Sequence, residues 1–383
     1  MTDGNAAGTG EAPPERGGGV RMGRILGVPV YVTPAWFLVA GLITFFFADT
    51  VEESVPGLGA GRYVVSASFA LLLYGSVLLH ELSHTVVALR LGLPVRRVTL
   101  HLLGGFSEIE REPDTPGREF LVAAAGPIVS LALGGLGMLL VLVTERGTVV
   151  FLLAWSVALA NLLVGGFNLL PGLPLDGGRV LRAGVWKVSG RPYTGTMAAA
   201  WVGRGLAVVV LAVPLLLPVF TDESPDLVSV VWAALVASFV WVGASQSIFG
   251  ARVRERLPEL QARTLARRAV PALADVPVSE ALRRMEEAGA TGIVVVDGNG
   301  QPSGIVNEAA VTATPEHRRP WVALSAVSRH LEPGLELGID LVGEDLLAAM
   351  RRSPATEYLV RDEDGAVYGV LSASDVDRVF ASV

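Results

Sequence analysis

The sequence predicts an α-helical polytopic membrane protein with about six transmembrane helices and a short membrane-associated β-hairpin, followed by a soluble α/β tail. Three observations support this fold class. Of the 383 residues, 51% are hydrophobic and only 17% are charged, against roughly 25% charged in an ordinary soluble domain. Long uncharged stretches recur before residue 250, most of them near the ~20 residues that cross a bilayer. After residue 250, Arg, Glu and Ala dominate and one pattern occurs twice.

The uncharged stretches give the expected helices in order. In the first, residues 28–48, Pro29 and Pro34 place the start of the regular helix near Ala35. In the fifth, Pro214 and Pro218 should kink or thin the helix. The expected domains are a disordered tail at 1–20, a membrane domain at 21–250, a linker at 251–268 and the soluble pair at 269–383. The remaining expected spans are 63–89, 120–143, 148–170, 206–220 and 227–249.

The basic residues of the short loops predict the orientation. Twelve of them fall on the side that holds both termini, and only Arg62 and Arg146 fall on the other. By the positive-inside rule the termini are then cytoplasmic. Lysine occurs once, at Lys187, which is typical of a GC-rich bacterial genome, so we expect a multi-pass protein of the bacterial inner membrane.

The second span ends in His80-Glu81-Leu82-Ser83-His84, and the sixteen residues before it carry no charge. On a helix, His80 and His84 lie one turn apart on one face, where two imidazoles can hold one metal ion, with Glu81 beside them to act on a water molecule. Ionisable groups at membrane depth are costly unless an ion, a water cavity or a partner compensates them. This pattern indicates a zinc peptidase centre.

A catalytic zinc takes three protein ligands, and Asp176 is the best source of the third. It follows 28 uncharged residues from Thr148, in a segment that Pro171, Gly172 and Pro174 must break. Irregular backbone at membrane depth is tolerated where it lines a cavity or packs on protein. The alternative is that Asp176 only caps the following helix, expected at residues 179–186.

Residues 98–110 predict two short strands that turn at Gly104-Gly105. Such a hairpin beside a metal could offer a strand edge to an extended peptide, or it could be an amphipathic interfacial loop. His101 lies within it. A lone loop histidine is more often solvated than bound to metal.

HELSH on the second span together with Asn168-Leu169-Leu170-Pro171-Gly172-Leu173-Pro174-Leu175-Asp176-Gly177-Gly178 resembles the site-2 protease family of intramembrane zinc metalloproteases. The resemblance covers residues 21–249. It implies one zinc ion held by His80, His84 and Asp176, a general base at Glu81, and a transmembrane protein as substrate. It also implies that Asn168 orients the substrate or the oxyanion, and that Gly126 and Ser130 bring the third helix close to the active site.

The tail contains two copies of one pattern at an offset of 65 residues, from Ser279 and from Glu344. Each copy reads helix, strand, turn, strand, helix. The pair resembles a CBS-domain tandem, which implies binding of an adenine nucleotide, control of the membrane domain and possible homodimerisation. The family's ligand pattern matches Gly369, Ser372 and Asp375 in the second copy. The first copy has Gly304, Asn307 and Ala310, so it lacks the acidic residue, and a purely structural pair is the alternative.

Composition excludes some functions. The chain has no cysteine, which rules out disulfides and thiolate zinc sites, and its net charge of −7 argues against nucleic acid as a partner. The competing functional class is a CBS-gated transporter or metal-sensing channel. Transport would require polar groups through the membrane span, where Arg204 is the obvious extra candidate.

Overall fold

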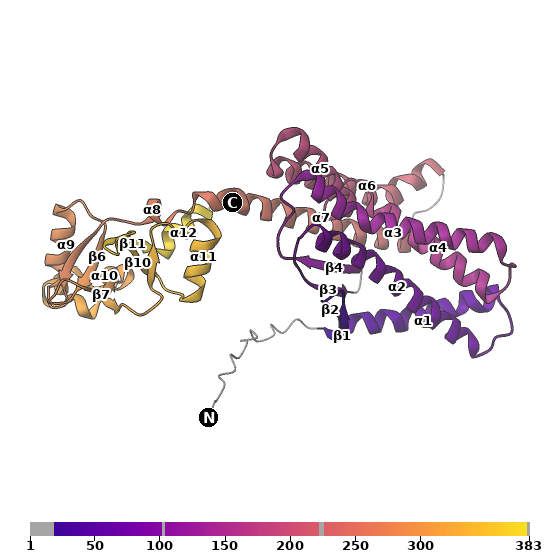
Figure 1. Ribbon diagram of the computed structural model, residues 1–383, viewed down its shortest axis with the longest axis horizontal. Coiled ribbons are helices and arrows are strands. Elements are labelled where there is room, and N and C mark those ends of the chain that lie inside the picture. The colour runs from indigo at the N-terminus through magenta and orange to yellow at the C-terminus, as the bar shows by residue number, and fades with distance from the viewer. Residues whose placement is uncertain (1–18, 102–103, 222–225, 381–383) are drawn as a thin grey trace, which may run out of the picture. The chain divides into compact units, whose positions relative to one another are not determined.

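The computed structural model describes residues 19–101, 104–221 and 226–380 (Figure 1). The chain separates into two compact units, residues 1–248 and 249–383, and each is described by itself. The expected disordered tail lies almost entirely outside the described residues.

Unit 1 contains helices that are long and apolar enough to cross a membrane, and six such helices occur among the described residues, as the sequence predicts. Most of their surfaces are apolar and exposed, as expected for helices that face lipid. The fifth begins 14 residues earlier than expected and continues through both Pro214 and Pro218. The six are α1 (Pro34–Ser54), α2 (Gly61–Arg90), α3 (Pro116–Val143), α4 (Val149–Asn168), α6 (Pro192–Thr221) and α7 (Leu227–Arg256).

Helices α3 and α4 approach each other along a line of glycines. An added Cβ at Gly134 would lie 2.7 Å from the Leu162 side chain, and one at Gly137 would lie 2.8 Å from Ala158 Cβ. On α4, Gly165 faces Leu131 at 3.0 Å in the same way. Within a membrane, close helix packing of this kind replaces the hydrophobic driving force that water supplies elsewhere.

A four-stranded sheet with the order β1-β2-β3-β4 lies in unit 1. The predicted hairpin is present as β3 and β4, but its predicted turn at Gly104-Gly105 is wrong. His101 pairs with Gly104, so both glycines belong to β4, and the connection is made by residues 102–103, outside the described residues. The strands are β1 (Val20–Ile25), β2 (Val28–Val32), β3 (Val95–His101) and β4 (Gly104–Ile109).

Strand β2 accounts for the first residues of the expected span 28–48, because residues 28–32 are apolar but extended. They pair in parallel with β3, with Val30 opposite Val98, and the helix begins at Pro34, close to the predicted start near Ala35. Proline fits the first turn of a helix, where an N–H has no partner in any case. The backbone N–H of Thr33 donates to Leu100 O at 3.0 Å, which fixes the start of α1 to the tip of β3.

The chain breaks between α4 and a short helix, α5 (Asp176–Ser189), which starts earlier than the predicted 179–186. Gly177 and Gly178 allow this start to fold back on the preceding loop. A Cβ at Gly177 would lie 2.3 Å from Leu169 O, and one at Gly178 would lie 2.2 Å from Leu173 N. Asp176 is therefore the first residue of a helix that is pressed against the proline-rich break.

Unit 2 has the α/β structure that its two repeats predict, with sheets of order β5-β6-β7-β8 and β11-β10-β9. Buried Val294, Ile305, Leu359 and Val370 pack together and join one sheet to the other. The strands are β5 (Ala269–Leu273), β6 (Gly292–Val296), β7 (Pro302–Val306), β8 (Ser328–His330), β9 (Glu336–Gly338), β10 (Glu357–Arg361) and β11 (Val367–Ser372). The helices are α8 (Ala262–Leu265), α9 (Val278–Glu287), α10 (Glu308–Ala313), α11 (Gly343–Arg352) and α12 (Ala373–Phe380), with 3-10 turns at Leu257–Glu259, Glu316–Trp321 and Leu324–Ala326.

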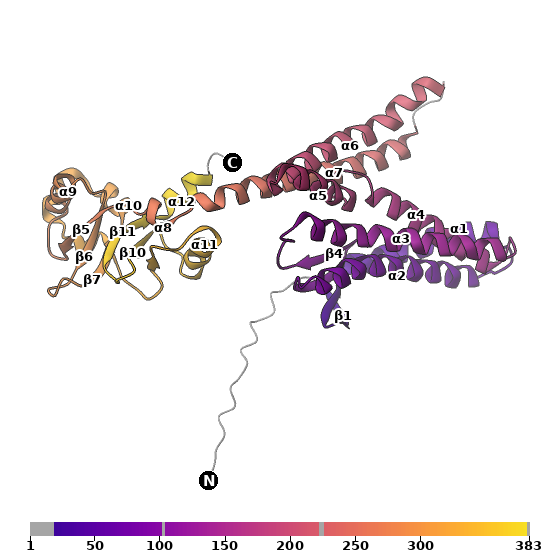
Figure 2. The ribbon, with the colours of Figure 1, turned by 45° about the horizontal axis from the view of Figure 1, so that its top comes forward.

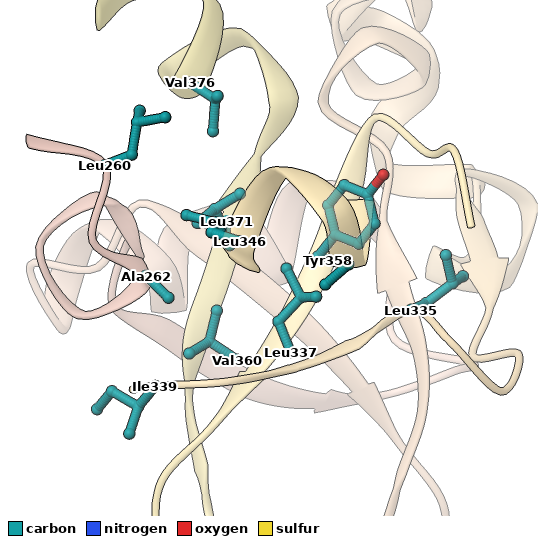
Figure 3. Packing of buried hydrophobic residues seen from close by; sticks show 11 residues of the cluster. Leu260, Ala262, Leu335, Leu337, Ile339, Leu346, Tyr358, Val360, Leu371 and Val376 are labelled. Atoms are coloured by element: carbon teal, nitrogen blue, oxygen red, sulfur yellow. The ribbon is translucent and has the colours of Figure 1, made fainter. Parts of the chain in front are cut away.

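The second repeat is held together by the apolar cluster in Figure 3. Fully buried Leu346 of α11 and Leu371 of β11 lie at its centre. The Tyr358 ring belongs to the cluster, while its hydroxyl accepts from Ala355 N at 2.8 Å and donates to Ser353 O at 3.0 Å. A buried tyrosine costs little when its hydroxyl is bonded in this way. Leu260 and Ala262, from the second half of the expected linker, are part of this core.

Candidate metal centre

Three side chains from two distant parts of unit 1 converge at one point. Nε2 of His80 lies 3.2 Å from Oδ2 of Asp176, and Nε2 of His84 lies 3.3 Å from the same oxygen. One ligand atom from each of the three residues lies within 4.8 Å of the others. Both histidines are buried. The donor set of two imidazoles and a carboxylate is one that zinc accepts in catalytic sites.

The other nitrogen of each imidazole is bound from α3. His84 Nδ1 donates to the Val122 carbonyl at 2.7 Å, and because a carbonyl can only accept, Nδ1 carries the proton. Nε2 of His84 then keeps the lone pair that a metal needs. His80 Nδ1 lies 2.9 Å from Ser130 Oγ, which is itself buried. Ser130 therefore contacts a metal-ligand candidate directly.

Gly126 of α3 leaves room for both imidazoles. An added Cβ would lie 2.2 Å from His84 Nε2 and 2.4 Å from His80 Nε2. A Cβ does not approach a non-bonded atom this closely, so any residue larger than glycine would displace the two Nε2 atoms that face Asp176. Because Gly126 has no side chain, a space remains at the point where the three ligand atoms meet.

Glu81 is fixed by the hairpin. Ser107 of β4 donates to Glu81 Oε2 at 2.9 Å and lies 3.1 Å from the Glu81 backbone carbonyl. Thr85, one turn along α2, also binds that carbonyl, at 3.1 Å. A Cβ at Gly105 would lie 2.2 Å from Glu81 Cγ, so glycine is required there by the glutamate rather than by a turn. No sequence pattern marks Ser107, because its contact with Glu81 depends on the register of β3 and β4.

These residues open on a cleft of about 420 Å³. Asn168, at the end of α4, lies on its wall together with Phe167 and Phe239. His101 is exposed and is not among the described residues that line it. Glu108, another carboxylate of the hairpin, forms an ion pair with Arg97 at 2.6 Å and does not line the cleft. The lining residues are Val77, His80, Glu81, His84, Gly104, Gly105, Phe106, Ser107, Ile109, Val164, Phe167, Asn168, Pro174, Leu175, Asp176, Arg179 and Phe239.

A buried ion pair ties α5 to α3 beside the metal-ligand candidates. The Glu119 side chain is fully buried, and its carboxylate accepts from Arg179 Nε at 3.0 Å. Arg182 approaches it at 3.5 Å. Burial by itself lowers the pKa of Arg179, but the charge of Glu119 outweighs it and the pKa is raised.

In unit 2, the residues expected to bind a nucleotide are already engaged. Arg267 binds both oxygens of Asp375, at 2.6 and 2.8 Å, and Ser372 Oγ lies 2.9 Å from Ser374 Oγ. A Cβ at Gly369 would lie 2.2 Å from Arg267 O. Asp375 therefore has an internal partner where a nucleotide was expected. Sequence reasoning missed Arg267, because it assigned that residue to the linker.

Unit 2 also has a cleft, of about 320 Å³, beside Arg267. Its walls come from both repeats, with Thr291 and Thr312 from the first and Glu357 and Ser372 from the second. Arg267 also reaches it, and binds Glu308 at 2.9 Å.

Six membrane helices around a buried His, His and carboxylate cluster, with a glutamate next to the first histidine, define the class of membrane-embedded metallopeptidases. The comparisons agree. The model of peptidase family M50 matches residues 68–150 and 143–212, and the CBS-domain model matches residues 263–313. The chain therefore carries an M50 (site-2 protease) peptidase region and a CBS region, and it is a zinc metalloprotease of the membrane like the relatives that it resembles.

Among its relatives is a putative zinc metalloprotease of Synechocystis, 29% identical over 373 residues, which are 93% of this chain and 94% of that protein. The putative zinc metalloprotease Rip3 of Mycobacterium tuberculosis is 38% identical over 231 residues, covering 59% of this chain and 58% of Rip3. The solved site-2 protease of Methanocaldococcus jannaschii is 28% identical and covers 60% of this chain and 95% of that one, with a TM-score of 0.41.

Proposed function

We propose that this protein hydrolyses peptide bonds of membrane-embedded proteins by regulated intramembrane proteolysis, with one zinc ion per chain bound by His80, His84 and Asp176. The observation that carries the proposal is the meeting of these three ligand atoms within 4.8 Å on the cleft that Glu81 also lines. Four ionisable side chains at membrane depth are costly without such a use.

The chemistry follows from the side chains. A zinc ion held here would polarise the scissile carbonyl and acidify a water molecule. Glu81 takes a proton from the attacking water and passes it to the leaving amine. Asn168, on the cleft wall, donates its amide N–H groups to the substrate backbone or to the developing oxyanion. The Val122 carbonyl holds His84 in the tautomer that this requires, and Ser130 positions the His80 ring.

Strand β4 supplies a place for an extended substrate. It is the last strand of its sheet, and Gly104, Gly105, Phe106, Ser107 and Ile109 line the cleft. A peptide segment must lose its helical hydrogen bonds before hydrolysis, and pairing with a free strand edge replaces them. This supports the strand-edge interpretation of the hairpin over that of a simple interfacial loop.

We propose that the protein lies in the inner membrane of a bacterium with both termini in the cytoplasm. The twelve-to-two distribution of basic residues in the short loops favours this orientation. Since the chain has no cysteine, single-cysteine variants report it directly. Cysteine at Glu53 should react with an impermeant thiol reagent from outside the cell, and cysteine at Ser189 should not. The reverse pattern would invert the topology.

For unit 2 we propose that an adenine nucleotide regulates proteolysis. It would bind at Gly369, Ser372 and Asp375, with Asp375 at the ribose, and a homodimer would form through the CBS pair. The support is the pairing of the two repeats and a cleft between them. Because Arg267 occupies the Asp375 carboxylate, the nucleotide must displace it.

The test of the catalytic proposal separates ligand from base. Glu81→Gln should retain zinc and lose cleavage of a model transmembrane substrate, because the ligands remain and the base is gone. His84→Ala and Asp176→Ala should lose both zinc and cleavage. Full activity with bound zinc in Asp176→Ala would show that the third ligand is wrong. Ion flux in liposomes, without cleavage, would favour the transporter class instead.

A further inference from the structure

The hairpin formed by β1 and β2 exposes an apolar and basic surface at the edge of unit 1. All residues from Val20 to Gly27 are exposed, and Met22 and Leu26 expose 63% and 61% of their surface. Two arginines, Arg21 and Arg24, alternate with them. By contrast Val28, Val30 and Val32 of β2 are buried. The hairpin thus has one strand that packs and one that does not.

The tip of this hairpin holds an unusual residue. Leu26 has φ +54° and Gly27 has φ +81°, so the two form a tight turn with both residues in the left-handed region. Such turns favour Asn-Gly or Asp-Gly, because a branched apolar side chain is strained there. An exposed leucine gains no packing within the protein in return. A use outside the protein would account for both the strain and the exposure.

The sheet connects this hairpin to the ends of two membrane spans. Val30 of β2 pairs with Val98 of β3, and β3 begins five residues after the end of α2, a membrane span. At the other end β2 runs through Thr33 directly into α1, the first span. Figures 1 and 2 both show β1 at the margin of unit 1.

We propose that the β1–β2 hairpin docks on the lipid headgroups, with Met22, Ile25 and Leu26 at the acyl boundary and Arg21 and Arg24 on acidic phospholipids. The depth is set by the backbone. β1 is an edge strand, and unpaired N–H and C=O groups are not tolerated in hydrocarbon, whereas headgroups and water can bind them. Arginine close to an anionic membrane surface is worth about fivefold in binding per residue.

A competing explanation is that Arg21, Arg24 and the bulge between Arg21 and Gly23 only protect the strand edge from pairing with other chains. That explanation accounts for the charges and the bulge. It does not account for three apolar side chains beside them, one of them in a strained turn, since apolar edges promote association rather than prevent it.

The experiment uses the full chain, which has no cysteine of its own. Leu26→Cys carries an environment-sensitive fluorophore in nanodiscs of phosphatidylcholine, with or without phosphatidylglycerol. Leu38→Cys, on the exposed face of α1, is the lipid-facing control, and Asn299→Cys, in an exposed turn of unit 2, is the water-facing control. The readout is emission wavelength and quenching by spin-labelled lipids.

The label at residue 26 should shift to the blue and be quenched as at residue 38, and the shift should grow with phosphatidylglycerol. In the background of Arg21→Gln with Arg24→Gln, that lipid dependence should disappear while the quenching remains. Quenching no stronger than at residue 299 would overturn the proposal. So would a blue shift without quenching, which would mean that protein covers the hairpin. An equal signal in both lipid mixtures would overturn the assignment of acidic headgroups.

Discussion

The hydroxyl of Ser107 donates a 2.9 Å hydrogen bond to the carboxylate of Glu81, so the proposed general base is held by the same strand that is proposed to receive the substrate. Residues on α2 and β4 that are 26 positions apart are thereby joined at the reaction site. A strand that shifted by one residue would turn Ser107 away from the cleft. Substrate docking and base positioning are then properties of one structural element.

Ser107→Ala should lower kcat about ten-fold or more with little change in KM, because a hydrogen bond to a charged group is worth roughly 1.5–3 kcal/mol. Zinc content should stay at the wild-type level, since no ligand is touched. Ser107→Thr should restore much of the rate. The control is Ser68→Ala, whose exposed hydroxyl binds only Val64 O in its own helix. A change in KM alone would assign Ser107 to substrate binding instead.

Gly126→Ala should abolish stoichiometric zinc, because the new methyl group would occupy the point where the two Nε2 atoms converge. Gly135→Ala is the matched control on the same helix, since a Cβ there meets no atom within 4 Å. Metal analysis of the purified proteins distinguishes them. Normal zinc content in Gly126→Ala would contradict the proposed position of the ion.

Glu119→Ala should destabilise unit 1 by about 3 kcal/mol, because it leaves the partly buried Arg179 without its closest partner, while Arg182 keeps Glu112 at 2.7 Å. It should also weaken zinc binding, since Arg179 lies one turn after Asp176 on α5. The control, Asp114→Ala, removes an exposed partner of Arg118, a pair worth about 0–1 kcal/mol. Thermal unfolding with and without a chelator measures both effects. Equal stability of the two variants would show that the buried pair is not needed.

Asp375→Ala should weaken binding of an adenine nucleotide by more than about tenfold, and Arg267→Gln should strengthen it by a similar factor, because Arg267 competes for the same carboxylate. Arg361→Gln breaks an equally close pair with Glu336 in unit 2 and serves as control. Calorimetry on the full-length protein decides the matter. Binding in none of the variants would leave the repeats a structural role.

Patterns within a single stretch of sequence predicted much of this structure. Charge-free runs predicted six membrane helices, and the spacing of His80 and His84 with the break before Asp176 predicted which side chains meet. What they did not predict depends on pairing between distant segments. Residues 28–32 are as apolar as a membrane helix, and only β3 makes them a strand. Ser107, Glu119 and Arg267 likewise acquire their partners 26, 60 and 108 residues away.

The glycine line between α3 and α4 limits how the cleft can open. Because Gly134, Gly137 and Gly165 bring the two backbones close together, separating the helices would leave grooves that a lipid chain fills poorly. This pair therefore acts as a closed wall behind the metal-ligand candidates. On the function proposed above, a substrate helix would enter between other helices, and its entry would leave the contacts of α3 with His80 and His84 in place.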